Sequence, residues 1–287
     1  MSFDAFIESA WDDHADQADA VAVRLGQSLA VVETPAQIPA YARLVTHVFG
    51  EHLGEWQRGV ALLDALRKAA AGDDSAGTAA IARGIATLRY GGGDAQVLAG
   101  LTIEDRIIVL ATASAALVGQ RRFLPAIEAY TQAMQLAPGA PAGSPAPRAL
   151  AVGGNNLASA LEGKPDRDAA ETAGMVAAAE CALQYWKLAG TWLEEERAEY
   201  RLTRSLLQAR DASRAAVSAG RCIRICTENV APPFELFFAH AVQAIALRAA
   251  GDHAASADAR LHALAQYALA APGEQAWCKS DLDELGV

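Results

Sequence analysis

Aromatic residues make up only 6% of this 287-residue chain, and runs of β-branched residues are short and scattered. Alanine and leucine dominate instead. Alanine and leucine are strong helix formers, and alanine lets helix backbones approach one another, so the composition is typical of a helical protein. Because 52% of the residues are apolar, the chain can bury a substantial core and global disorder is not expected.

The chain also has few cysteines and no long apolar run. Its four cysteines show no Cys-x-x-Cys spacing and no disulfide framework. No stretch of about 18 apolar residues suggests a membrane span. The first 20 residues hold six acidic residues and no lysine or arginine, so a secretory signal is not expected. We therefore predict a soluble, reduced, cytoplasmic protein.

Basic residues are outnumbered, with 24 lysines and arginines against 34 aspartates and glutamates. The resulting net charge of −10 argues against nonspecific binding to nucleic acid or to anionic membranes, since both need a basic surface. A local basic face is still compatible with an acidic protein. We expect neither nucleic acid nor membrane as a partner.

The clearest internal unit lies at residues 111–141, ATASAALVGQRRFLPAIEAYTQAMQLAPGAP. It predicts a helix with small residues on one side, a short turn, and a second, amphipathic helix. Pro138 and Gly139 end this second helix. The second helix is indicated by apolar or small residues at helical spacing, namely Phe123, Ala126, Ile127, Tyr130, Ala133, Met134 and Leu136.

This block resembles the tetratricopeptide repeat family, whose units of about 34 residues are antiparallel helix pairs. The resemblance is carried by Ser114 and Leu117 on the first helix, Phe123 at the turn, Ala126, Tyr130 and Ala133 on the second helix, and Pro138 at the end. It implies an all-α fold, a right-handed α-solenoid of stacked antiparallel helix pairs, with small residues where helices cross closely.

Weaker copies of the unit occur on both sides of this block. If Gly59, Ala126, Ala170, Ala215 and Ser256 are equivalent, the spacings are 67, 44, 45 and 41 residues. The later spacings predict helices longer than the usual repeat has. The first gap leaves room for an extra helix or helix pair, which residues 78–90 supply.

We predict one tetratricopeptide-like solenoid over residues 1–287. Residues 1–40 form N-terminal capping helices, because the end of a solenoid would otherwise expose its core. Residues 41–137 hold the first repeats with the extra helix pair, 138–147 form a loop rich in proline and glycine, and 148–270 hold further repeats. Residues 271–287 form a C-terminal cap with an acidic tail, which is expected to fray.

The stretch GGNNLASALEG, residues 153–163, could be a glycine-rich ligand loop or the first helix of a repeat. It lacks the Lys-Ser/Thr ending of a phosphate loop and the Gly-x-Gly-x-x-Gly spacing, so we favour the helix. In the tetratricopeptide family the first helix of each pair lines the concave surface. The resemblance therefore implies partner-binding roles for Asn155, Asn156 and Ser159.

The corresponding face of the next unit carries Arg197, Tyr200, Arg201 and Arg204. The three arginines are spaced four and three residues apart, so they share one face of a helix. They could bind a carboxylate or a phosphate, which a guanidinium holds through two parallel hydrogen bonds. Alternatively, glutamates of the same helix could neutralise them, at positions 194, 195, 196 and 199.

No metal site or cofactor is predicted. His47 and His52 are five residues apart, about 140° around an α-helix, so their imidazoles should diverge. Their order with Glu51 also differs from the zinc-binding His-Glu-x-x-His motif. Cys222 and Cys226 are interpreted as core residues, because buried free cysteines behave as small hydrophobes.

No nucleophile elbow, nucleotide loop or paired-carboxylate motif is present, so an enzyme is not predicted. The predicted function is a noncatalytic scaffold or adaptor that binds a protein or peptide segment, such as one with an anionic end, in its concave groove. The alternative is a sensor of a small anionic molecule with a pocket near the arginine-rich helix 191–209. The oligomeric state, monomer or homodimer, is left open.

Overall fold

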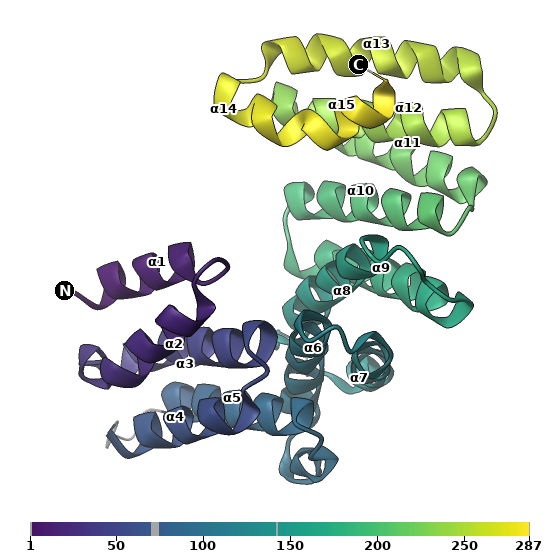
Figure 1. Cartoon of the computed structure of the whole chain (residues 1–287). Helices are drawn as coiled ribbons and strands as arrows, with labels where there is room; N and C mark the ends of the chain where they lie inside the picture. The colour runs from purple at the N-terminus through teal and green to yellow at the C-terminus, as the bar shows by residue number, and fades with distance from the viewer. Residues whose placement is uncertain (1, 70–74, 142, 287) are drawn as a thin grey trace. The chain divides into compact units, whose positions relative to one another are not determined.

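The structure is a computed structural model that describes residues 2–69, 75–141 and 143–286, where every regular element is a helix (Figure 1). Residues 1, 70–74, 142 and 287 lie outside the described residues. Of these, residue 142 falls in the predicted loop and residue 287 in the predicted acidic tail. The predicted all-α architecture is confirmed.

The helices group into two compact units, Met1–Gly153 and Gly154–Val287, with the boundary inside α8. The first unit holds α1 (Phe3–Asp13), α2 (Ala18–Gln27), α3 (Ile38–His47), α4 (Trp56–Ala69), α5 (Ser75–Gly91), α6 (Ile103–Gly119), α7 (Phe123–Leu136) and the start of α8 (Ala146–Glu162). The second holds the rest of α8, α9 (Ala169–Ala189), α10 (Trp192–Gln208), α11 (Ala212–Glu228), α12 (Pro233–Ala249), α13 (His253–Leu269), α14 (Pro272–Gln275) and α15 (Lys279–Leu285).

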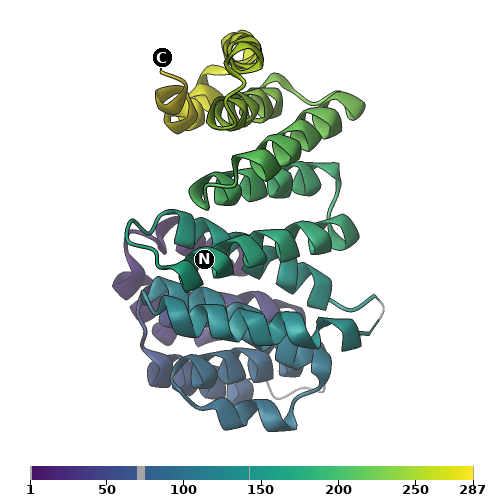
Figure 2. The same cartoon turned by 90° about the vertical axis from the view of Figure 1, so that its right-hand side faces the viewer.

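Short turns of one design connect several consecutive helices. The turn after α6 bonds the amide of Arg121 to the carbonyl of Val118 and that of Arg122 to Leu117, both at 2.8 Å. Arg121 has a positive φ of 57°, as this C-terminal capping motif requires. The same motif follows α10, α11 and α12, at Arg210, Val230 and Gly251. The helices that these turns connect therefore reverse direction and lie side by side (Figure 2).

Small side chains line the contacts inside these helix pairs. Ala126, Ala129 and Ala133 of α7 are completely buried. The Ser114 hydroxyl of α6 donates a hydrogen bond of 2.9 Å to the carbonyl of Ala126, which needs a close approach of the two helices. The pair predicted from residues 111–141 is thus confirmed. The stretch GGNNLASALEG is also helical, as the second half of α8.

The predicted equivalence of Ala170 is wrong, because this alanine is exposed. Helix α9 begins after Asp168, whose side chain caps it together with Glu171. Asp211 and Asp252 likewise cap α11 and α13, four residues before Ala215 and Ser256. Counted in the same way from the Asp168 cap, the position equivalent to Ala215 and Ser256 is residue 172, and not Ala170.

The first unit contains one irregular turn that matters for the site described below. Helix α3 continues into a π-helical turn, η3 (Val48–His52). Its backbone is pressed against the end of α6, where the Gln120 amide donates a hydrogen bond of 2.9 Å to the carbonyl of Glu51. A Cβ atom added at Gly119 would lie 2.1 Å from that carbonyl oxygen, so only glycine fits.

We expect Gly119→Ala to destabilise the first unit by about 1–3 kcal/mol or more, because the methyl group must push the η3 backbone away. The shift of the urea midpoint, followed by circular dichroism, measures this. Gly26→Ala is the matched control, since a Cβ atom there meets nothing within 4 Å. That change should be neutral or stabilising by up to about 1 kcal/mol. Equal midpoints for the two variants would contradict the packing argument.

Candidate functional site

Helix α10 carries the predicted arginine-rich face, and its start is built as the sequence indicates. The Thr191 side chain accepts a hydrogen bond from the amide of Leu193, and the Glu194 carboxylate accepts one of 2.8 Å from the Thr191 amide. Ala198, Leu202 and Leu206 bury the opposite face of the helix. Burial of this apolar stripe fixes the direction in which the polar side chains project.

Each of the three arginines is paired with a glutamate from a different helix. Arg197 holds Glu235 of α12 through two hydrogen bonds, of 2.5 and 3.3 Å. Arg201 pairs with Glu162 of α8, whose other oxygen accepts a bond of 2.6 Å from Ser205. Neither of the two sequence-based alternatives foresaw this arrangement, because the acidic partners lie far away in the sequence.

The C-terminal helix supplies the next two contacts of this face. The Tyr200 hydroxyl donates a hydrogen bond of 2.7 Å to Asp281, and Arg204 contacts both oxygens of Glu284, one at 2.8 Å. Both carboxylates belong to α15, which lies beside α12 in Figure 1. Leu285 is buried as well. The prediction that the acidic tail frays is therefore wrong for residues 279–286, because these ionic and apolar contacts hold them.

The glutamates of α10 have other partners. Glu199 is completely buried and accepts hydrogen bonds from Ser218, at 2.5 Å, and from Arg221, at 2.6 Å. Glu195 pairs with Lys187. Glu196 is 1% exposed, and its Oε1 atom has no hydrogen-bond partner among the described residues. Burial, with the nearby charge of Glu235, raises the pKa of Glu196 to about 8.

The other predicted partner-binding residues lie on α8. Asn155 and Ser159 are partly exposed and share a helical stripe with Glu162, the partner of Arg201. Asn156 is exposed and points about 100° away from Asn155. The structure thus connects the stripe of Asn155 and Ser159 to the α10 face and leaves Asn156 outside it.

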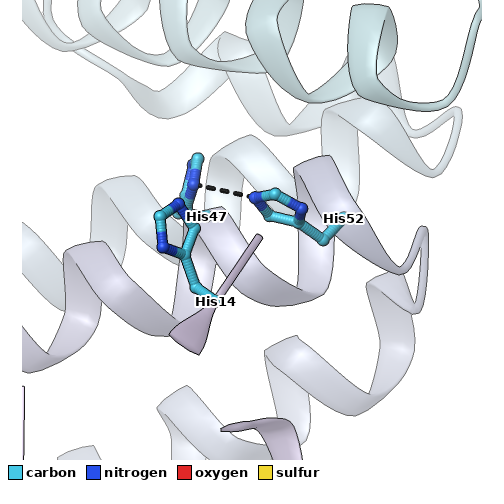
Figure 3. Close-up of side chains that lie close together, drawn as sticks. All are labelled: His14, His47 and His52. Atoms are coloured by element: carbon cyan, nitrogen blue, oxygen red, sulfur yellow. Dashed lines mark hydrogen bonds between the residues drawn. The ribbon is translucent and has the colours of Figure 1, made fainter. Parts of the chain in front are cut away.

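The prediction that His47 and His52 diverge is wrong. In η3 the amide of Leu53 bonds to the carbonyl of Val48, five residues earlier. A π-helix has more residues per turn than an α-helix, so side chains five apart come to one face. The Nε2 atoms of the two rings are 3.0 Å apart. Figure 3 shows both rings close to that of His14, which follows the last residue of α1.

Sequence reasoning missed this cluster of three histidines for two reasons. His14 is 33 residues from His47, and no local pattern signals the π-helical turn. The imidazole centroid of His14 lies 4.9 Å from that of His47 and 5.0 Å from that of His52. Burial and the neighbouring His47 lower the pKa of His52, while Glu51 acts in the opposite direction. The neutral imidazole is thereby favoured.

No protein-family model and no curated protein matches this chain. Among solved structures it is similar to BtubC (BKLC) from P. vanneervenii, with a TM-score of 0.50 and 16% sequence identity over 93% of this chain and 92% of that chain. The predicted tetratricopeptide-like fold is confirmed. At this identity the similarity concerns the fold alone.

Within residues 2–69, 75–141 and 143–286, no helix combines the length and the apolar character needed to cross a bilayer.

The buried carboxyl group of Glu196 predicts a pH-dependent stability. Its pKa rises from 4.5 in the unfolded chain to about 8 in the folded one. Its protonated form therefore contributes stability that is complete below pH 4.5 and is lost as the pH rises to about 8. Glu196→Gln, which cannot ionise, should gain roughly 2–4 kcal/mol relative to wild type between the two ends of this range.

Urea unfolding of both proteins at several pH values measures this difference. Replacing the carboxyl group by an amide can also change the free energy of unfolding by an amount that is the same at every pH. This constant amount cancels when the difference between the two proteins is followed across the pH range. Glu228→Gln is the control for the same chemical change at the surface, since the Glu228 side chain is 57% exposed. A constant offset between Glu196→Gln and wild type would refute the assignment.

Proposed function

We propose that the protein is a noncatalytic protein-binding scaffold whose second unit recognises an acidic segment of a partner. The proposed recognition face consists of Arg197, Tyr200, Arg201 and Arg204 on α10, with Asn155 and Ser159 on α8. One observation supports it most directly: the acidic helix α15 already contacts this face through Asp281 and Glu284.

The chemistry of these contacts suits an acidic helical segment. Asp281 and Glu284 are three residues apart, so they share one face of α15 and meet Tyr200 and Arg204 together. A guanidinium that holds both oxygens of a carboxylate gives charge-assisted, orientation-specific hydrogen bonds. A partner segment with the same acidic spacing could replace α15 at this face.

The covalent connection of α15 sets the strength that such a partner needs. A segment on the same chain has an effective concentration of about a millimolar when its linker is short. A partner therefore has to bind more tightly than α15 or extend to further contacts. Arg197 offers one, because its side chain is 56% exposed although it holds Glu235.

A sensor of a small anion is the second candidate, and the ion pairs favour it less. The guanidiniums of Arg197, Arg201 and Arg204 each hold a carboxylate of the chain, so a small anion would have to displace one. It would replace one ionic contact by another without the extra apolar burial that a peptide provides.

The test is binding of a fluorescent peptide of residues 272–286 to full-length chains. Asp281→Asn with Glu284→Gln weakens the internal contact, so this double variant should bind the peptide at least about tenfold more tightly than wild type. Adding Arg204→Gln should abolish the gain. A peptide carrying the same two neutral substitutions should bind weakly to all chains. Fluorescence anisotropy gives the affinities.

Arg224→Gln is the matched control, because Arg224 is an exposed arginine of α11 whose ion pair with Glu228 lies within its own helix. Peptide binding that survives Arg204→Gln but not Arg224→Gln would reject the proposed face. Absence of binding to the double variant at millimolar peptide would reject the acidic-segment proposal. If inorganic phosphate then binds in an Arg204-dependent manner, the sensor is the better interpretation.

A further inference from the structure

The three histidines of the first unit converge from two separate segments. His14 caps the end of α1, whereas His47 ends α3 and His52 ends η3. One potential ligand nitrogen from each ring lies within 4.8 Å of the others, and all three residues are partly exposed (Figure 3). Among the described residues, this is where nitrogen ligands gather in a number that a metal ion would need.

The hydrogen bonds of two of the rings orient them as metal ligands. The Nδ1 atom of His14 contacts the carbonyl oxygen of Trp11, which can only accept a hydrogen bond, so this nitrogen carries the hydrogen. The Nδ1 atom of His47 lies 2.9 Å from the Glu51 carboxylate. In both rings the Nε2 atom is left with its lone pair, which in His47 accepts the hydrogen bond of 3.0 Å from Nε2 of His52. Such a hydrogen bond from the second nitrogen accompanies most histidine ligands of metals and fixes their tautomer.

The separation of the nitrogens suits a shared ion. Two nitrogens bound at 2.0–2.1 Å to one tetrahedral zinc ion lie about 3.3 Å apart. The Nε2 atoms of His47 and His52 are 3.0 Å apart, close to that value. His14 has to move its ring inward by about an ångström or two to complete the set. Its position just beyond the end of α1 allows this rotation.

We propose that His14, His47 and His52 bind a divalent transition-metal ion of the zinc class, with Glu51 as the positioning residue for His47. Three imidazoles suit zinc, copper, nickel or cobalt, whereas magnesium and calcium prefer oxygen ligands. The fourth position is left to solvent or to a group supplied by a partner. The ion would connect the end of α1 to η3 and so stabilise the first unit.

Calorimetric titration of chelator-treated full-length protein with zinc chloride tests the site. Wild type should bind one zinc ion with a Kd in the micromolar range or tighter, and its thermal midpoint should rise with zinc. His52→Gln should weaken binding by more than about 100-fold, because it removes a ligand, and Glu51→Gln by about 10–100-fold. His14→Gln provides a second ligand variant if His52→Gln disturbs η3.

His262→Gln is the control, because His262 pairs with His240 in the second unit, at a centroid distance of 5.1 Å, and should leave zinc binding unchanged. The Trp11 ring supplies an independent signal, since its centroid lies 5.0 Å from that of His14 and 5.1 Å from that of His47. Cupric ion should quench part of the tryptophan fluorescence in wild type. Trp11→Phe should remove that quenching while zinc still binds.

Zinc binding that is equally strong in wild type and in both His52→Gln and His14→Gln would overturn the proposal. Equal weakening by His52→Gln and His262→Gln would do so too, because it would indicate scattered surface histidines. Failure of wild type to bind zinc at millimolar concentration would leave a cluster of packed imidazoles with no metal role.

Discussion

Helix backbones can approach closely only where small side chains lie between them, and this constraint organises the helix pairs of the chain. At α6 and α7 the approach is close enough for the Ser114 hydroxyl to reach the carbonyl of Ala126. The α12 and α13 pair repeats it, with Ser256 bonded to the carbonyl of Ala244 at 2.8 Å. Each serine hydroxyl thus donates its hydrogen bond to a backbone carbonyl inside the apolar contact between the two helices.

Small and apolar side chains fill the contacts between helices, and the proposed recognition face is therefore made of polar residues at helix edges. In the second unit these are charged groups in interhelical pairs, in which residues such as Arg201 and Glu162 come from different helices. Such pairs orient one helix against the next. They also place cations where a carboxylate from outside the chain could compete for them. The same contacts thus hold the fold and define the proposed recognition face.

The sequence was informative wherever a local pattern sets the structure. The spacing of Ala126, Tyr130 and Ala133 predicted α7, and Thr191 with Glu194 predicted the start of α10. These features depend on neighbours within one or two helical turns. The register at Ala170 was missed because alanine-rich helices offer several faces of similar character, and only the Asp168 cap decides among them.

The candidate sites were less accessible to sequence reasoning. The arginines of α10 were correctly placed on one face, yet their partners could not be assigned. Glu162, Glu235 and Glu284 lie between 38 and 80 residues away along the chain. Local helix phase gives the direction of a side chain but not what lies opposite it. The prediction for the histidines failed for a stronger reason. It assumed an α-helical phase between residues 48 and 52, where the chain forms a π-helical turn.

The π-helical turn makes chain length, as distinct from residue identity, a determinant of the first unit. An α-helix advances by about 100° per residue, so deleting one residue from η3 would turn everything that follows by about that angle relative to α3. His52 would then swing away from His47, and the contact of Glu51 with the end of α6 would be lost even with each of these side chains retained. Insertions and deletions are tolerated in most loops of a helical protein, but here a single one would change which side chains meet.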